Sequence, residues 1–153
     1  MTPIEESIVA SLKEKFGSQI KEAKVNRARR VSVLVEAGSH KAVISYLKEA
    51  HGPAILSAIT ATDMRSELEV CFSIWCYEKK TYVLIKSKIP RENPIIESIV
   101  DIIPGSTLYE REAHELLGVD FKGHPNQERL LLPDDWPEGS YPLRKDWKPQ
   151  EVA

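Results

Sequence analysis

The residues best suited to chemistry lie close together, in a short segment that we predict to be a helix. Glu110 and His114 are four positions apart, so a helix would place both side chains where they could chelate a metal, with His124 nearby in the chain. The second histidine of the zinc-binding His-Glu-x-x-His helix is absent, because Leu117 and Gly118 occupy its place. A metal site is therefore the weaker interpretation of this segment.

The favoured interpretation is a helix that presents fixed charges to another surface. Thr107 and Glu110 have capping-box spacing, which predicts that the helix begins at Thr107, runs to Leu117 and stops at Gly118. A helical wheel predicts a buried stripe formed by Tyr109, Ala113, Leu116 and Leu117. The opposite arc carries Glu110, Arg111, Glu112, His114 and Glu115.

The chain changes character from Phe121 onward. Between Lys122 and Glu151 there is no Val, Ile or Thr, and five of the ten prolines fall in this stretch. The stretch also holds Trp136 and Trp147, which makes it too apolar for a free tail. We predict an extended, proline-stiffened arm over residues 121–153 that buries its aromatic side chains, either on its own domain or, preferably, on a partner.

The first 120 residues predict the domain that carries this arm. Hydrophobic periodicity and turn residues indicate helices over 2–17, 39–52, 93–104 and 107–117, and strands over 20–25, 30–35, 54–62, 68–77 and 81–89. Thr2, Ser39 and Asn93 are the expected helix caps. This order predicts an α+β domain over residues 1–120, with a mixed, largely antiparallel sheet and helices packed on one face.

The two cysteines are predicted to be packed thiols. Cys71 and Cys76 lie five positions apart on one predicted strand, so they point to opposite faces of the sheet. They can neither bridge each other nor share a metal.

Composition and charge narrow the class of protein further. The 153 residues include 21 Lys or Arg and 23 Asp or Glu, and the net charge of -2 gives no overall attraction to nucleic acid or anionic lipid. No segment approaches the ~20 apolar residues of a membrane span. Glu5 and Glu6 stand where a secretory signal would carry basic residues, so we expect a cytoplasmic protein that contacts a membrane only through partners.

Two other classes of function stay open at this point. One is a stand-alone metalloenzyme that uses Glu110, His114 and His124. The other is a nucleic-acid-binding module that uses the basic edge between residues 21 and 30, although no aromatic residues are interleaved there for base stacking.

A dense set of motifs resembles the signature of a known family. The motifs are Glu110-Arg111-Glu112-Ala113-His114-Glu115-Leu116-Leu117-Gly118, Phe121, His124-Pro125, Arg129-Leu130-Leu131 and Tyr141-Pro142-Leu143-Arg144-Lys145-Asp146. In this order they closely resemble the C-subunit family of NADH:quinone oxidoreductase, respiratory complex I, which includes the equivalent small subunits of membrane-bound group 4 [NiFe] hydrogenases and related archaeal complexes. One position departs from the family pattern: Glu128 stands where a basic residue or proline is usual.

The resemblance implies a non-catalytic subunit in the peripheral arm of such a complex. Its partners would be the large catalytic subunit, the small iron–sulfur subunit and other peripheral-arm subunits, on the cytoplasmic side of the cell membrane. The chain itself would hold no cofactor; iron–sulfur clusters, and a [NiFe] centre in the hydrogenase-type complexes, would lie in partner subunits. The residues predicted to contact partners are Glu110, Arg111, Glu112, Glu115, Phe121, His124, Pro125, Arg129, Trp136, Tyr141, Pro142, Leu143, Arg144, Lys145, Asp146 and Trp147.

The chain ends soon after the Arg144-Lys145-Asp146 motif, whereas many C subunits of the respiratory enzyme continue. This brevity resembles the hydrogenase-type and archaeal members, including sulfur-reducing and F(420)H(2)-oxidising complexes. We therefore expect a complex of that kind, with NADH:quinone oxidoreductase proper as the alternative.

Overall fold

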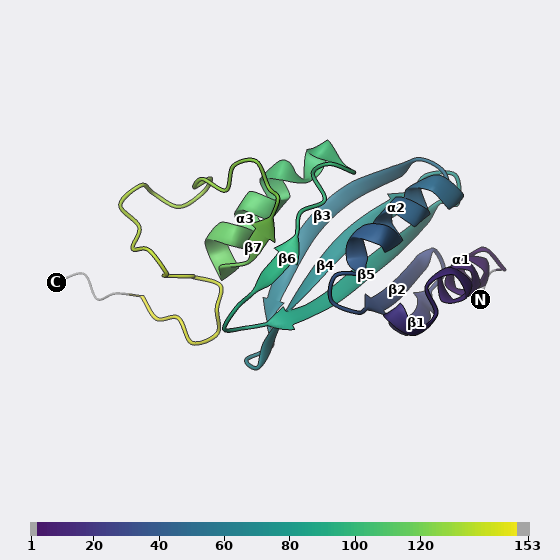
Figure 1. Ribbon diagram of the computed structural model, residues 1–153, viewed down its shortest axis with the longest axis horizontal. Helices are drawn as coiled ribbons and strands as arrows, with labels where there is room; N and C mark the ends of the chain where they lie inside the picture. The colour runs from purple at the N-terminus through teal and green to yellow at the C-terminus, as the bar shows by residue number, and fades with distance from the viewer. Residues whose placement is uncertain (1–2, 150–153) are drawn as a thin grey trace.

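The computed structural model describes residues 3–149, which form three α-helices, two short 3-10 turns and seven strands (Figure 1). In chain order these elements are α1 (Pro3–Phe16), η1 (Gly17–Gln19), β1 (Ile20–Arg27), β2 (Arg30–Val35), α2 (His40–Ala50), β3 (Ala54–Asp63), β4 (Glu67–Cys76), β5 (Thr81–Pro90), β6 (Ile95–Glu97), η2 (Pro104–Ser106), α3 (Thr107–Leu117) and β7 (Asp120–Lys122).

The main sheet has five strands in the order β1-β2-β5-β4-β3. Only the β2–β5 pair is parallel; the other three neighbouring pairs are antiparallel. The α+β class and the largely antiparallel sheet are confirmed. Alternating Val, Leu and Ile residues made these strands predictable, because one face of the sheet is fully buried.

That buried face and the three helices share one core. From β4, the inward side chains are Leu68, Val70, Phe72, Ile74 and Cys76, and the helices add Ile8, Leu12, Val43, Leu47 and Ala113. Cys71 lies on the opposite, half-buried face, so the predicted separation of the two cysteines is confirmed. Burial raises the pKa of the Cys76 thiol to about 11, so at neutral pH it stays protonated and packs as a small apolar group.

The segment 93–104 is not the helix that its spacing predicts. Ile95–Glu97 form strand β6, which pairs in parallel with β7 in a second, two-stranded sheet. Ile96 and Ile99 are buried, whereas Ile95 is exposed. The prediction was wrong because the spacing of the isoleucines fits a helix equally well, and the strand partner lies 25 positions further along the chain.

Two of the predicted helix caps also differ from the structure. Ser39 occupies the cap position of α2 without a side-chain hydrogen bond to the helix. Thr107 is the first residue of α3 rather than its cap, because the turn η2 already brings Ser106 into helical backbone geometry. Thr2 lies outside the described residues. Gly118 ends α3 in the left-handed conformation, with φ 78°, as predicted.

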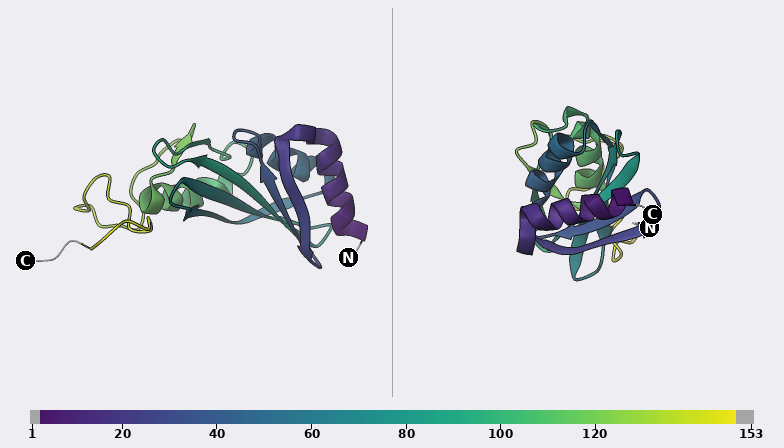
Figure 2. Two further views of the ribbon diagram at one scale, coloured as in Figure 1. Left: turned by 90° about the horizontal axis from the view of Figure 1, so that it is seen from below. Right: turned by 90° about the vertical axis from the view of Figure 1, so that its right-hand side faces the viewer.

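Between residues 123 and 149 the chain contains neither helix nor strand. This segment, called the arm below, leaves β7 and forms a wide loop at the end of the molecule opposite α1 (Figures 1 and 2). Among the described residues, no helix is long and apolar enough to cross a membrane.

Candidate partner-binding site

A buried carboxylate of α3 binds the backbone of the arm. Glu115, which is buried, accepts hydrogen bonds from three successive backbone NH groups: Leu130 at 3.2 Å, Leu131 at 2.8 Å and Leu132 at 2.8 Å. Bonds from several NH groups to one carboxylate are charge-assisted and fix the direction of the backbone. Glu115 was predicted to contact a partner, but its oxygens are used inside the chain.

Two arginines bind backbone carbonyls of the arm between residues 128 and 136. Arg111 on α3 donates to the backbone carbonyls of Glu128 at 2.9 Å and Arg129 at 2.6 Å. Arg129 in turn donates to the carbonyl of Pro133 at 3.2 Å and to that of Trp136. Both guanidinium groups thus replace the backbone partners that a strand or helix would supply.

The two tryptophans of the arm form a pair. The rings of Trp136 and Trp147 are stacked with centroids 5.9 Å apart and 22° between their planes. Both indole NH groups donate to Ser140, one to its carbonyl and one to its hydroxyl, each at 2.9 Å. The arm therefore partly buries its own aromatic side chains against each other.

Residues 141–144 of the arm pack on the C-terminal end of α3. Leu143 donates its NH to the Leu116 carbonyl at 3.1 Å, and Arg144 Nε donates to the Leu117 carbonyl at 2.9 Å. The Arg144 guanidinium also lies 4.6 Å from the centre of the Tyr141 ring. Arg144 thus satisfies a carbonyl that a helix end leaves without an intrahelical partner.

Gly118 allows this close approach. A Cβ at this position would lie 2.6 Å from the Tyr141 ring and 2.9 Å from Arg144 Nη2, in a backbone conformation with φ 78°. We expect Gly118→Ala to destabilise the protein by about 2 kcal/mol and to expose Tyr141. Gly123→Ala is the matched control, since Gly123 has a similar φ of 89° but open space around it; urea unfolding of both variants separates the steric cost from the backbone cost.

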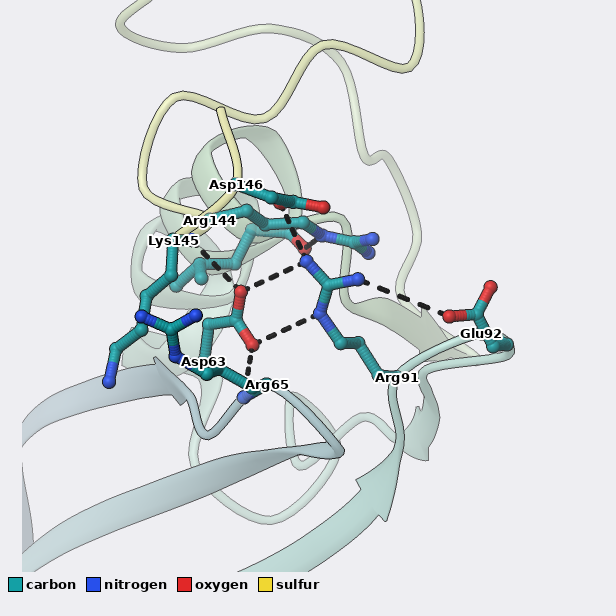
Figure 3. Close-up of polar contacts among 8 residues, drawn as sticks. Asp63, Arg65, Arg91, Glu92, Arg144, Lys145 and Asp146 are labelled. Carbon is teal, nitrogen blue, oxygen red and sulfur yellow. Dashed lines mark hydrogen bonds and ion pairs between the residues drawn. The ribbon is translucent and has the colours of Figure 1, made fainter. Parts of the chain in front are cut away.

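A cluster around Asp63 ties the end of the arm to the main sheet (Figure 3). Arg91 Nε and Nη2 donate to the two oxygens of Asp63 at 3.0 and 3.1 Å, and Nη2 also contacts Asp146 at 2.7 Å. The backbone NH groups of Lys145 and Arg65 donate to Asp63 at 2.9 and 2.8 Å. Asp63 is buried, at the end of β3, whereas Asp146 is exposed.

The electrostatics of the cluster follow from these bonds. The hydrogen bonds from Arg91 hold the pKa of the Asp63 carboxyl well below its ordinary value of 3.8, against the opposing effect of burial, and the NH groups of Lys145 and Arg65 lower it further. Asp63 is therefore an anion at every physiological pH. The Asp146 carboxylate of the arm and Asp63 share one arginine between them.

Glu110 has an internal role as well. Its side chain is fully buried and accepts hydrogen bonds from Ser98 Oγ at 2.6 Å, the Ile99 NH at 2.8 Å and Ser106 Oγ at 3.2 Å. These bonds hold the segment after β6 against the start of α3. Glu110 does not form the predicted capping box with Thr107, whose hydroxyl donates to the Pro104 carbonyl.

The candidate metal ligands do not come together. His114 Nδ1 lies 2.8 Å from the Val119 carbonyl, and His124 Nε2 lies 3.1 Å from the Thr107 carbonyl. Over residues 3–149 no group of three or more His, Cys, Asp or Glu side chains is arranged to hold a metal ion. Both histidines instead bind backbone carbonyls and so stabilise the turns that flank α3.

Several leucines on α3 and the arm are exposed. Leu131 is 60% exposed, Leu143 57%, Leu108 55% and Leu130 37%. Beside Leu143, a small pocket of about 160 Å³ opens between β3 and α3, lined in part by Ala61, Glu112 and Leu116. A second pocket, of about 340 Å³, lies between α3 and the loop of the arm, with Trp136 and Tyr141 among its lining residues. Apolar side chains and small pockets of this kind are typical of surfaces that bind another protein.

Known proteins share the region that contains α3 and the arm. The family model described as respiratory-chain NADH dehydrogenase, 30 Kd subunit, matches residues 33–152, which include both. The chain belongs to this family. The predicted resemblance to the C subunit of complex I is therefore confirmed, and the matched range includes the motifs from Glu110 to Asp146.

Similar 30 Kd subunit family proteins come from different complexes. The C subunit of F(420)H(2) dehydrogenase from Methanosarcina mazei is 37% identical, over 93% of this chain and 90% of the relative. The beta subunit of the membrane-bound hydrogenase from Pyrococcus furiosus is 34% identical, over 97% and 90%. The C subunit of NADH-quinone oxidoreductase from Geotalea uraniireducens is 32% identical, over 91% and 85%.

Chains in solved structures also have this fold. A chain in the structure of the membrane-bound sulfane sulfur reductase, an archaeal respiratory membrane complex, superposes with a TM-score of 0.83 at 32% identity, covering 94% of this chain and 85% of that one. A trypsin-resistant fragment of Nqo5 shares the fold, with a TM-score of 0.64 at 19% identity over 76% of this chain and 96% of that one.

The predicted contact residues of this 30 Kd subunit family member divide by exposure. Buried ones are Glu110, Glu115 and Phe121; half-buried ones are Arg111, His124, Arg129, Trp136, Tyr141, Pro142, Arg144 and Trp147; exposed ones are Glu112, Pro125, Leu143, Lys145 and Asp146. Asp63 and Arg91 were not predicted, because they lie far from the arm in the chain and carry no local motif. Leu131 was likewise not predicted as a contact residue, although it belongs to the motif Arg129-Leu130-Leu131.

Proposed function

We propose that this protein is a non-catalytic subunit of a membrane-bound oxidoreductase related to respiratory complex I, and that it packs against the large catalytic subunit with α3 and the arm. The observation that carries the proposal is the prefolded arm, which internal hydrogen bonds to Glu115, Arg111 and Arg144 hold in place while its leucines point outward. A surface that is ordered before binding loses little conformational entropy on association.

The residues that we propose for direct contact are the exposed ones. Leu131 and Leu143 are the apolar anchors, and Glu112 and Lys145 supply charge at the rim. Glu110, Glu115 and Phe121 act indirectly, since each supports the surface from inside. Arg144 is in the same class, because its guanidinium bonds to α3.

We further propose that the complex is of the hydrogenase-related or archaeal type, with NADH:quinone oxidoreductase proper as the alternative. The similarity to F(420)H(2) dehydrogenase, membrane-bound hydrogenase and the sulfane sulfur reductase complex supports this choice. Cysteine pairs for nickel in the neighbouring large subunit would favour a hydrogenase, and their loss would favour a quinone or sulfur enzyme.

In this arrangement the chain orders and shields a neighbour that carries the redox chemistry. The small iron–sulfur subunit and other peripheral-arm subunits are the further partners that we propose, and the iron–sulfur clusters, with a [NiFe] centre in a hydrogenase, belong to those partners. The position that we propose is peripheral, on the cytoplasmic side of the cell membrane, with partners making the membrane contact.

The proposal predicts the effect of charged substitutions on the arm. We expect Leu131→Asp combined with Leu143→Asp to reduce co-purification of the large subunit by at least about tenfold, because two exposed anchors would become charged in a desolvated interface. The measurement is the amount of large subunit recovered with a tagged copy of the full chain expressed in its own host.

Ile4→Asp is the control, since Ile4 is similarly exposed, at 46%, but belongs to α1, which lies at the opposite end of the molecule (Figure 1). It should leave recovery unchanged. Equal recovery with the double variant and the wild type would contradict docking through the arm, as would undiminished assembly of a chain truncated after Leu132.

A further inference from the structure

On the face of the main sheet that lies opposite the helices, charged side chains are, among the described residues, paired at one end and unpaired at the other. At the end nearer the arm, the charged side chains pair with one another: Lys86 with Glu69 at 3.0 Å and Lys88 with Glu67 at 2.7 Å. Opposite charges on neighbouring strands neutralise each other there. This end of the face therefore has no net charge to attract a partner.

A different row of side chains crosses the same face at the far end of the strands. The strand register places Arg27 beside Arg30, Arg30 beside Tyr82, Tyr82 beside Trp75, and Trp75 beside Ile55. The centroids of the Trp75 and Tyr82 rings are 4.7 Å apart, and the Arg30 guanidinium lies 5.6 Å from the centre of the Tyr82 ring. The row thus combines aromatic rings with cations.

Two turns add positive charge beside this row. Because β2 and β5 are parallel and begin side by side, the β1–β2 turn and the β4–β5 turn lie at the same end of the sheet. Arg29 in the first turn accepts a hydrogen bond at its carbonyl from the Tyr82 NH at 2.9 Å, and Lys79 and Lys80 belong to the second turn. All three side chains are exposed.

The acidic groups at this end leave the cations without ion pairs. Glu5 on α1 is buried and accepts the backbone NH of Arg29, and the Glu78 carboxyl lies against Gly52. Within residues 3–149 no ion pair involves the five cations of this end, which are Arg27, Arg29, Arg30, Lys79 and Lys80. Beside them, Tyr77 is 63% exposed and Ile55 52%.

We propose that this end of the sheet binds an acidic segment of another protein subunit. The surface, here called the cationic platform, consists of Arg27, Arg29, Arg30, Ile55, Trp75, Tyr77, Lys79, Lys80 and Tyr82. Carboxylates of the segment pair with the arginines, and an apolar side chain packs on Ile55 and the Trp75 ring. The inference rests on the proposed function, since the segment belongs to a neighbour in the same complex.

Geometry makes this contact separate from the arm. Ile55 and Asp63 lie eight residues apart on β3, which corresponds to roughly 26 Å along an extended strand. The arm contacts the sheet at Asp63, so the cationic platform and the arm face different parts of the surroundings. The subunit would accordingly join two neighbours, or two parts of one large neighbour.

The form of the platform favours an acidic protein over a lipid or nucleic-acid ligand. Trp75 and Tyr82 are half-buried in the sheet, so their rings do not project as a membrane anchor requires. Arg30 lies over the Tyr82 ring, which removes a free face on which a nucleic-acid base would stack.

Photo-cross-linking in the assembled complex tests the proposal. A photoreactive phenylalanine analogue replaces Tyr77 in the platform or, as control, Glu22, which lies on the same sheet face at its charge-paired end. We expect a cross-link from position 77 to an acidic peptide of another subunit, and none from position 22. Arg27→Glu combined with Arg30→Glu should lower the yield at least about tenfold, and reversing the carboxylates of the identified peptide to lysine should restore it.

Co-purification separates this test from that of the proposed function. If the chain fails to co-purify with any partner, the proposed function fails. If it co-purifies but position 77 yields no product, or a product with lipid, nucleic acid, a second copy of this chain or a peptide without carboxylates, the cationic platform is not the proposed site. An undiminished yield in the charge-reversed variant would overturn it equally.

Discussion

Glu115→Ala should weaken the contact between the arm and α3. The substitution removes one carboxylate and leaves the NH groups of Leu130, Leu131 and Leu132 without their acceptor. Hydrogen bonds to a charged group contribute about 1.5–3 kcal/mol each before partial solvation of the freed NH groups offsets the loss, so we expect the arm to open more easily by about 2 kcal/mol. That change corresponds to roughly 30-fold faster cleavage of a site that is accessible only when the arm is open.

Limited trypsin digestion measures this opening, because Arg129 lies beside the bonded backbone. The matched control is Glu112→Ala, on the same helix, since Glu112 is exposed and is not hydrogen-bonded to the arm. The control should be cleaved at the wild-type rate. If Glu115→Ala were also cleaved at the wild-type rate, the carboxylate would not be what holds the arm.

Asp63→Ala is expected to have the second large effect, on the attachment of the arm to the main sheet. It leaves the largely buried Arg91 guanidinium without its main partner and the Lys145 NH without an acceptor. Removing one member of a buried ion pair costs about 3 kcal/mol or more, since the remaining charge is desolvated. We therefore expect a clear loss in the free energy of unfolding, measured in urea, together with release of the C-terminal part of the arm.

The pH dependence provides a second measurement on the same site. Arg91 lowers the pKa of Asp63 in the folded protein, so the contribution of Asp63 to stability is complete above the unfolded-state value of 3.8 and is lost as the pH falls below it. Asp63→Asn should consequently lose less stability than the wild type between about pH 7 and about pH 3. Asp134→Asn, an exposed substitution in the arm, should follow the wild type. Parallel curves for Asp63→Asn and the wild type would contradict this role.

The two attachments differ in how far the sequence revealed them. Glu115 stood within a recognisable motif, yet the helical wheel placed it on an outward arc and suggested a partner. In the structure it is buried because the arm folds back over that arc, and the wheel treats only the helix itself. Leu116, predicted to be buried, is half-exposed, because it lines the small pocket between β3 and α3 beside Leu143.

Sequence patterns predicted the structure well where burial depends on neighbours within a few residues. Alternation along β4 and β5 predicted the sheet, and Gly118 predicted the end of α3, because each depends on neighbours within a few residues. They failed at residues 95–97, because the pairing partner, strand β7, follows α3 in the chain, 25 positions later. A three-residue strand carries too little pattern to be distinguished from a helical turn.

By itself, the sequence determined the α+β class, the main strands, α3 and the family, since these depend on periodicity, turn residues and the order of motifs. Only the tertiary structure decided that Glu110 and Glu115 serve the interior, that Asp63 and Arg91 hold the arm, and which leucines stay exposed. The physical reason is that a polar side chain is buried only where donors from distant segments reach it, and Asp63 meets Lys145 across 82 positions of the chain.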